Sequence, residues 1–229
     1  MSLFTETLVA RLSQMNLTLQ PAQTALCEEY FRRVTEANAH LNLTRITEPV
    51  QAAQQHFADA MFICSVWDIP QQCRMIDVGT GAGFPGVPLL ILRPDIRMTL
   101  LDASGKKTDF VRRTLEALGL GAEIICGRAE ELRDIHGSYD AAVSRAVSPL
   151  RILLELCIPL LKTGGMLASW KGEQHAQECD EAAGALEKLG CAISASHPIG
   201  RGALLLIEKQ KPTPKDYPRR FSKIKNNPL

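Results

Sequence analysis

Residues 74–86 constrain the fold of this 229-residue chain more than any other stretch. Residues 75–78 form a short apolar run that predicts a buried strand, and the glycines within residues 79–83 allow a sharp backbone turn. From Phe84 the sequence is apolar enough to begin a helix, and Pro85 suits the first helical turn because its missing N–H would have no partner there. A strand, a glycine-rich turn and a helix in this order predict the first unit of a nucleotide-type α/β fold.

The glycine spacing allows two interpretations of the ligand. Residues 81–86 match the dinucleotide fingerprint G-x-G-x-x-G, and Asp102 follows about 20 residues later, where a ribose-binding acid is expected. However, the predicted strand ends at Val78, so the first glycine after it is Gly79 and the fingerprint begins two residues too late. Pro85 also removes one of the N–H groups that a pyrophosphate requires at a helix N-terminus.

The alternative spacing is Asp77-x-Gly79-x-Gly81-x-Gly83, which resembles the acidic-x-G-x-G-x-G loop of S-adenosylmethionine (AdoMet) methyltransferases. AdoMet carries no phosphate, so it needs fewer N–H groups from the loop. A carboxylate at the end of the strand, Asp77, suits the cationic side of this ligand and the ordering of the loop. The glycines alone are weak evidence, because a turn without a ligand would look similar.

The distribution of charge points to a basic C-terminal segment. The net charge of +1 neither favours nor excludes a nucleic-acid partner. Residues 209–225, however, contain seven lysines and arginines and a single acid, Asp216. Such a segment is expected either to bind a polyanion or to be a solvated chain end.

The cysteines and the N-terminus bear on the cellular compartment. The seven cysteines show no C-x-x-C pair and no Cys/His cluster, so they predict neither a zinc site nor a disulfide framework. Residues 1–19 are amphipathic and lack the continuous apolar core of a signal peptide, and no stretch reaches membrane-spanning length. We therefore expect a cytoplasmic protein without a metal.

Hydrophobic periodicity changes near residue 73. Residues 1–72 have helical spacing, which predicts an N-terminal helical extension. Strands and helices then alternate up to a terminal hairpin, and the basic tail covers residues 211–229. This pattern predicts an α/β, Rossmann-like core over residues 73–210, with a mostly parallel seven-stranded sheet and an antiparallel hairpin at its end. The predicted strands are 75–78, 98–101, 123–126, 141–144, 166–169, 192–196 and 203–207, and the predicted helices of the core are 84–92, 106–118, 150–161 and 174–189.

Polar residues follow several predicted strands, at the edge where such sheets bind ligands. Asp102 can accept both ribose hydroxyls; its alternative role is to cap the next helix, although Ser104 is better placed for that. Residues 127–130 could meet an adenine, or simply begin a helix with Glu130 near its positive end. Arg145 follows a buried apolar strand, where an unpaired charge is costly, so we interpret it as functional; Lys171 is a weaker case of the same kind.

Several motifs in order along the chain resemble those of the glucose-inhibited division protein B family, also called RsmG. They are Asn-Leu-Thr-Arg-Ile at 42–46, His-Phe-x-Asp at 56–59, Asp-Val-Gly-Thr-Gly-Ala-Gly-Phe-Pro-Gly at 77–86, Leu-Leu-Asp at 100–102, Gly-Arg-Ala-Glu-Glu at 127–131, Ser-Arg-Ala-Val at 144–147, Pro-Leu-Leu-Lys at 159–162 and Tyr-Pro-Arg-Arg at 217–220. The resemblance implies a class I AdoMet-dependent enzyme that methylates N7 of a guanine in 16S ribosomal RNA, near the decoding centre. It also implies cofactor contacts at Gly79, Phe84, Asp102, Ala103, Ser104, Ala129, Glu130 and Arg145.

This chemistry fits a sequence with no evident pair of base and nucleophile. N7 of guanine carries an unprotonated lone pair at neutral pH, so methyl transfer to it needs no general base and we assign no catalytic proton-transfer residue. The RNA partner, 16S rRNA or the small ribosomal subunit, requires phosphate contacts. The candidates are Lys106, Arg145, Lys171, Arg201, Arg219 and Arg220. We expect a monomer that does not bind membranes.

Two other functions remain open at this stage. A class I methyltransferase acting on a small molecule or a protein would keep the fold and the cofactor but would not need the basic tail. A non-enzymatic NAD-binding protein with a Rossmann-like fold would use the dinucleotide spacing, against which the offset of the glycines and Pro85 both count.

Overall fold

A computed structural model describes all 229 residues of the chain. Contacts within the chain divide it into two compact units, which we describe separately. Unit 1 comprises residues 1–72 and 80–126, and unit 2 comprises residues 73–79 and 127–229. The predicted division into an N-terminal extension, a core and a tail stays a prediction.

Unit 1 is mainly helical and contains two strands. Its longest helix, α2, starts at Pro21, where the missing N–H of proline suits the first turn, and it ends at Leu41. Asn42 then adopts a left-handed conformation with φ of 48°, which stops the helix. The elements are α1 (Leu3–Gln14), α2 (Pro21–Leu41), α3 (Pro49–Gln51), the π-helix η1 (Ala52–Ala58), α4 (Asp59–Met61), α5 (Ile63–Val66), α6 (Gly86–Leu92), β2 (Arg97–Asp102), α7 (Gly105–Leu118) and β3 (Glu123–Cys126).

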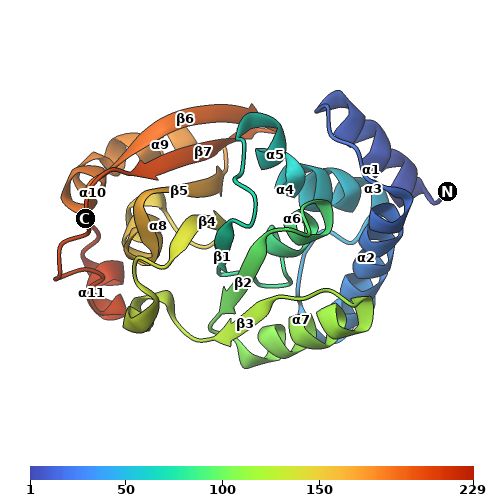
Figure 1. The fold of residues 1–229 in the computed structure, drawn as a ribbon, viewed down its shortest axis with the longest axis horizontal. Coiled ribbons are helices and arrows are strands. Elements are labelled where there is room, and N and C mark those ends of the chain that lie inside the picture. Colours follow the sequence, from blue (N-terminus) through green and yellow to red (C-terminus); the bar gives the residue numbers. More distant parts are fainter. The chain divides into compact units, whose positions relative to one another are not determined.

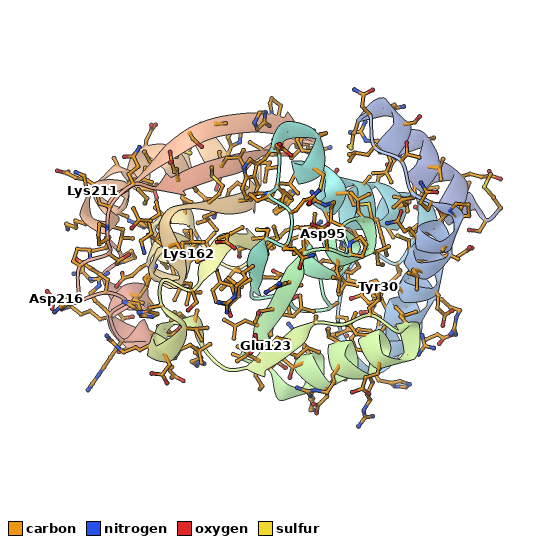
Figure 2. The ribbon with its side chains drawn as sticks, in the orientation of Figure 1. Tyr30, Asp95, Glu123, Lys162, Lys211 and Asp216 are labelled. Carbon is orange, nitrogen blue, oxygen red and sulfur yellow. The ribbon has the colours of Figure 1, made fainter.

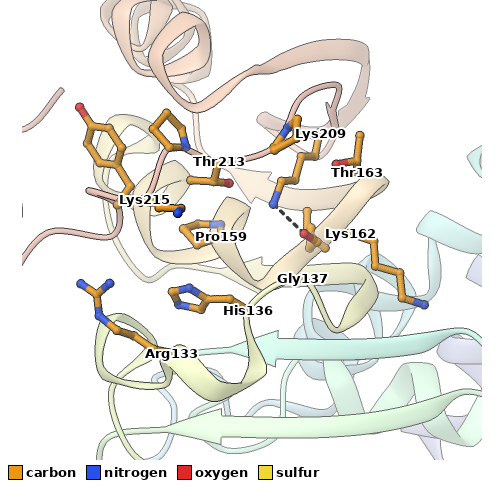
Figure 3. A pocket seen from close by; sticks show the side chains of 13 residues that line it. Arg133, His136, Gly137, Pro159, Lys162, Thr163, Lys209, Thr213 and Lys215 are labelled. Carbon is orange, nitrogen blue, oxygen red and sulfur yellow. Dashed lines mark hydrogen bonds between the residues drawn. The ribbon is translucent and has the colours of Figure 1, made fainter.

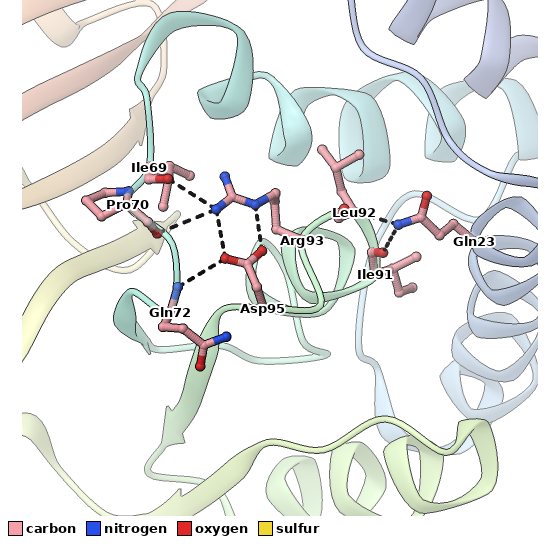
Figure 4. Close-up of polar contacts among 8 residues, drawn as sticks. All are labelled: Gln23, Ile69, Pro70, Gln72, Ile91, Leu92, Arg93 and Asp95. Carbon is pink, nitrogen blue, oxygen red and sulfur yellow. Dashed lines mark hydrogen bonds and ion pairs between the residues drawn. The ribbon is translucent and has the colours of Figure 1, made fainter.

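Polar side chains close the ends of α6 and β2 in unit 1 (Figure 4). Gln23 on α2 donates from Nε2 to the carbonyl oxygens of Ile91 and Leu92, which are left without helical partners at the end of α6. Arg93 and Asp95 form an ion pair with an Nε–Oδ1 distance of 2.7 Å just before β2. The C-terminal end of α6 is therefore closed by a side chain that is far away in the sequence.

Unit 2 contains five strands and four α-helices. Strands β6 and β7 form a long antiparallel hairpin beside β5, as Figure 1 shows. The elements are β1 (Arg74–Val78), η2 (Ala129–Glu131), η3 (Arg133–Ile135), β4 (Tyr139–Arg145), α8 (Leu150–Cys157), η4 (Ile158–Leu160), β5 (Leu161–Lys171), α9 (His175–Glu181), α10 (Ala183–Leu189), β6 (Cys191–Ile199), β7 (Gly202–Lys209) and α11 (Phe221–Asn226).

The strands form one seven-stranded sheet in the order β3-β2-β1-β4-β5-β7-β6. The pairs β2–β3, β1–β4 and β4–β5 are parallel, whereas β7 is antiparallel to both β5 and β6. The burial of each strand agrees with its place in the sheet. The central parallel strand β1 is buried at four consecutive residues, whereas the edge strand β6 alternates between less and more exposed residues. The predicted mixed sheet with a terminal hairpin is confirmed.

Three predicted helix boundaries were wrong. The helix predicted from Phe84 begins at Gly86, because the N–H groups of Gly83 and Phe84 both donate to the Thr80 carbonyl and close a turn first. The helix predicted to end at residue 161 ends at Cys157 and gives way to the short helix η4, which contains Pro159.

The third boundary lies within residues 174–189, which form two helices instead of one. The break is at Ala182, whose ψ of −1° turns the chain away from the helical path. None of the helices combines the length and the hydrophobicity needed to cross a bilayer.

Candidate functional site

In unit 1, the glycine loop after residue 79 is held mainly through its backbone. Gly81 and Gly83 have φ of 59° and 93°, values that favour glycine. Asp102, at the end of β2, accepts a hydrogen bond from Gly81 N at Oδ2 (2.9 Å) and one from Ser104 N at Oδ1 (2.8 Å). The predicted partners Gly81, Asp102 and Ser104 therefore lie together. Each carboxylate oxygen has a second lone pair, so Asp102 can also accept hydrogen bonds from a ligand.

Tyr30 on α2 contacts the same loop from within unit 1, and the sequence analysis did not assign it a role. Its buried hydroxyl donates to the carbonyl oxygen of Ala82 (Tyr30 is labelled in Figure 2). A Cβ atom on Gly83 would overlap this hydroxyl and would lie 2.7 Å from Val87 Cγ2. Tyr30 thus fixes the loop and also explains why residue 83 is a glycine. The helical spacing of residues 1–72 predicted a helix here but gave no indication of this contact.

An aromatic cluster surrounds Phe84, the residue that follows the loop. The rings of Tyr30 and Phe57 meet Phe84 edge-on, with centroids 5.6 and 5.4 Å away. The His56 ring stacks on Phe84 at 4.5 Å and 15°, and its Nε2 is hydrogen-bonded to Thr44 Oγ1 at 2.7 Å. His56 and Phe57 both belong to the π-helix η1, a helix type that often occurs at functional sites. Phe84 is therefore fixed on several sides.

The polar turn at residues 38–46 has the local role that Asn and Thr usually have. Asn38 Oδ1 accepts a hydrogen bond from Thr44 N at 2.8 Å, and Thr44 Oγ1 accepts one from Ile46 N at 3.0 Å. Thr44 also contacts His56, so the turn connects to the aromatic cluster beside Phe84.

In unit 2, the ends of β1 and β4 lie next to each other. Asp77 pairs in register with Val143, is fully buried, and precedes Gly79, whose φ is 75°. A Cβ atom on Gly79 would overlap Val147 Cγ2. Ser144 donates from Oγ to the Val78 carbonyl oxygen at 2.9 Å. The structure therefore places the segment around Arg145 beside Gly79, two sites predicted separately from the sequence.

Residues 127–130, predicted to bind the ligand after the strand at 123–126, lead into the short helix η2 of unit 2. Ala129 and Glu130 are 6% and 8% exposed. Oε1 of Glu130 is buried without a hydrogen bond, and the nearest cation is Arg128 Nη1, 4.0 Å away. A buried carboxylate oxygen without a hydrogen bond is rare in native proteins, which makes Glu130 a candidate ligand contact.

The six predicted phosphate contacts differ in how accessible their charges are. Lys171, with 6% of its side chain exposed, donates to Glu178 Oε2 at 2.9 Å and to the Ser148 carbonyl at 2.7 Å. Arg219 forms a two-pronged ion pair with the fully buried Glu155, at 2.8 and 2.6 Å. In contrast, Lys106, Arg201 and Arg220 are exposed and Arg145 is half-buried.

The two buried ion pairs change the interpretation of Lys171 and Arg219. Their charged groups are occupied by internal partners, so the structure gives both residues a role in stability. No group of three or more His, Cys, Asp or Glu side chains has the arrangement of a metal site.

Comparison with known proteins identifies the family. Residues 23–202 match the sequence model of a family described as rRNA small subunit methyltransferase G. The chain is 38% identical to the ribosomal RNA small subunit methyltransferase G of Desulforamulus reducens, over 94% of each chain. It is 36% identical to the protein of the same name from Lactobacillus delbrueckii subsp. bulgaricus, over 99% of this chain and 98% of that one. The chain belongs to this family.

Solved structures of methyltransferases share the fold of this family member. A SAM-dependent methyltransferase from Aquifex aeolicus superposes with a TM-score of 0.56 at 17% identity, covering 70% of this chain and 93% of that one. The ribosomal protein L11 methylase from Lactobacillus delbrueckii subsp. bulgaricus gives a TM-score of 0.54 at 21% identity, covering 69% and 79% of the two chains. The predicted family and the Rossmann-like methyltransferase fold are confirmed, and the methyltransferase interpretation is favoured over an NAD-binding protein.

Proposed function

We propose that this protein transfers a methyl group from AdoMet to N7 of a guanine in 16S ribosomal RNA. The observation that carries the proposal is the match, over nearly the full chain, to relatives named as methyltransferases of small-subunit ribosomal RNA. The glycine loop of unit 1, fixed by Asp102 and Tyr30, supports the cofactor assignment because it keeps backbone and carboxylate groups in a defined position.

The donor-binding residues carry the chemistry that AdoMet requires. Asp102 would accept hydrogen bonds from the ribose hydroxyls, and Oε1 of Glu130, which is buried without a hydrogen bond, would accept one from a donor group of the ligand. Gly79, Gly81 and Gly83 supply the backbone conformation of the loop, with φ of 75°, 59° and 93°, and the space of a Cβ atom at residues 79 and 83 is occupied by Val147 and Tyr30. The full set that we assign to AdoMet is Asp77, Gly79, Gly81, Gly83, Phe84, Asp102, Ala103, Ser104, Ala129, Glu130 and Arg145.

Methyl transfer to guanine N7 requires alignment and no proton transfer from the protein. Bound AdoMet would supply a methyl group on a sulfonium, which the N7 lone pair could accept while the bonding electrons return to the sulfur. No proton leaves the guanine, so the enzyme contributes by placing the three atoms in line, an effect worth up to roughly 7–11 kcal/mol in intramolecular reactions. This explains why we assign no general base.

The RNA contacts fall to the cations that remain accessible. Lys106, Arg201 and Arg220 are exposed, and half-buried Arg145 follows the end of β4 beside Gly79. Lys171 and Arg219 serve the protein internally and are left out of this set. We further propose that the partner is 16S rRNA or the small ribosomal subunit, and that the enzyme acts as a monomer in the cytoplasm.

The test is methyl transfer from labelled AdoMet to small-subunit RNA that lacks this modification. Naked 16S rRNA and assembled subunits should both be tried, and the label is expected on N7 of one guanine. Label on another atom, or on a small molecule or protein with none on RNA, would overturn the proposal.

Calorimetry with AdoMet on a pair of variants tests the proposed AdoMet-binding residues independently of methyl transfer. Asp102→Ala removes the carboxylate that contacts Gly81, so we expect at least tenfold weaker binding, about 1.4 kcal/mol. Asp109→Ala on the exposed face of α7 is the matched control and should bind within twofold of the unchanged protein.

A further inference from the structure

Unit 2 contains a cavity of about 620 Å³ at the end of β4 opposite to Arg145 (Figure 3). Its walls are η3, the start of β5, the end of β7, residues 212–215 and Tyr217. The β4–β5 side is closed by hydrogen bonds from Gly137 N to the Pro159 carbonyl (2.9 Å) and from Ser138 N to the Leu160 carbonyl (3.0 Å). The volume lies within the range of about 300–1,000 Å³ that is usual for small-molecule sites.

The charges that line this cavity are all of one sign. Arg133, Lys162, Lys209 and Lys215 contribute cations, and no Asp or Glu is among the lining residues. Lys162 is paired with Asp140 outside the cavity. Arg133 donates from Nη2 to the Pro218 carbonyl oxygen at 3.1 Å, which is a neutral acceptor and leaves its charge uncompensated. The cavity therefore attracts anions.

Lys209 is the cation buried most deeply. It is 4% exposed, and its Nζ donates to the carbonyl oxygens of Ile158 (3.0 Å) and Leu161 (2.7 Å). An ammonium group has three N–H bonds, so one remains for a further acceptor. Burial lowers the pKa of Lys209, because no carboxylate compensates for the water it has lost. An anion in the cavity would offset this cost.

Two neutral polar groups add to the anion-binding character. His136 Nε2 and Thr213 Oγ1 are both buried and have no hydrogen-bond partner. Burial lowers the pKa of His136, and the nearby charges of Arg133 and Lys209 lower it further. Both side chains can donate a hydrogen bond to an oxygen anion, so the cavity combines free donors with unneutralised charge.

We propose that this cavity binds a phosphate group, carried either by the RNA backbone or by a free nucleotide. Phosphate matches the cavity because it offers several oxygen acceptors to arginine, lysine and neutral donors at once. The seven residues of β4 separate the site from Arg145 by about 20 Å, so it is distinct from the proposed methyl-transfer residues. The proposal therefore does not depend on the proposed function.

Nuclear magnetic resonance of the His136 imidazole tests the site directly in the full-length protein. Inorganic phosphate is titrated at constant ionic strength, and His136→Asn identifies the resonance. We expect a saturable shift. The double variant Arg133→Gln/Lys215→Gln should weaken phosphate binding at least tenfold, whereas Lys188→Gln, which removes an exposed charge on α10, should change it less than twofold. A shift that does not saturate, or a double variant that binds like the unchanged protein, would overturn the proposal.

The pH dependence provides a second readout. Sulfate is the probe, because it does not titrate in this range. Protonation of His136 adds a donor and a charge facing Arg133, Lys162, Lys209 and Lys215. Because the pKa of His136 is lowered from its ordinary value of about 6.5, this protonation occurs at acidic pH, so sulfate should bind more tightly at about pH 5 than at about pH 7.5. Affinity independent of pH in this range, or unchanged in its pH profile by His136→Asn, would remove His136 from the site.

Competition distinguishes the two sources of phosphate. Displacement of phosphate by a short single-stranded RNA at concentrations at which AMP has no effect would assign the site to the RNA backbone. Displacement by AMP as readily as by RNA would assign it to a free nucleotide. The double variant should keep its affinity for AdoMet, so a failure here is separable from a failure of the proposed methyl transfer.

Discussion

The glycine loop of unit 1 and the C-terminal segment of unit 2 are both irregular, yet the protein fixes them by different interactions. Residues 80–84 are held by hydrogen bonds from the Tyr30 hydroxyl and to the Asp102 carboxylate, both through loop backbone groups. Residues 212–220 are held by a buried ion pair between Glu155 and Arg219. A loop fixed through its backbone keeps one face available to a ligand, whereas a segment fixed through its charges has fewer charges left for a partner.

This difference changes the expected role of the basic tail. The high charge of residues 209–225 allowed either a polyanion-binding segment or a solvated chain end, but Arg219 is bound to Glu155, and Lys209, at the end of β7, donates to two backbone carbonyls. The part of the tail around Arg219 is therefore a structural element of unit 2, whereas the neighbouring Arg220 is exposed. Four substitutions test this comparison.

The largest effect is expected for Glu155→Gln. The side chain of Glu155 is completely buried and accepts hydrogen bonds from Arg219 N, Nε and Nη2. Removing its charge leaves the arginine buried without a counter-charge, which should lower the free energy of unfolding by about 3–5 kcal/mol in urea denaturation. The double variant Glu155→Met/Arg219→Met removes both charges and should recover most of that loss. If the double variant is as unstable as the single one, the ion pair is not the cause.

The next largest effect is expected for Gly83→Ala in the loop. The new Cβ would overlap the Tyr30 hydroxyl, and φ of 93° strains any residue with a side chain. We expect a loss of about 2–3 kcal/mol in stability, together with weaker binding of AdoMet, measured by calorimetry. Gly121→Ala is the control, since nothing lies within 4 Å of its added Cβ. Equal effects of the two substitutions would contradict the close approach at Gly83.

A smaller effect is expected for Tyr30→Phe, which keeps the ring and removes only the hydroxyl. The Ala82 carbonyl oxygen loses its donor in a buried position, at a cost of about 1–2 kcal/mol. The loop becomes less fixed, so affinity for AdoMet should fall several-fold. Tyr217→Phe in the C-terminal segment of unit 2 is the matched control and should leave both quantities unchanged. An unaffected affinity in Tyr30→Phe would mean that the hydroxyl stabilises the fold without positioning the loop.

The sequence predicted those features that depend on neighbouring residues. The number and order of the strands and the glycine turn were predicted correctly, because apolar runs and glycines act locally, and Asp102 lies beside Gly81 as expected. The strand bounds were less accurate: β5 begins at Leu161, five residues before its predicted start. The contacts of Tyr30 with Ala82 and of Arg219 with Glu155 join residues 52 and 64 positions apart, and no local pattern reports such pairs. The ion pair of Lys171 with Glu178, which lies on α9 after the strand, was likewise not visible in the sequence, and the RNA contact of Lys171 stays a prediction. Charge was visible in the sequence, but its neutralisation was not.

The smallest effect, expected for Asp95→Asn, calibrates the buried pair of unit 2 against a partly exposed one in unit 1. The side chains of Arg93 and Asp95 are 26% and 28% exposed, and Asp95 also accepts from Gln72 N at 3.1 Å (Figure 4). The hydrogen bond from Arg93 lowers the pKa of Asp95 to about 2. Because this pKa is depressed, the folded state gains stability above the ordinary pKa of about 4 and loses it as the pH falls toward 2. Asp95→Asn should cost about 1 kcal/mol at pH 7, and the gap to the unchanged protein should shrink between pH 4 and pH 2 in urea denaturation. A gap that stays constant over this range would show that the carboxylate charge contributes nothing, and that only the hydrogen bond to Gln72 matters.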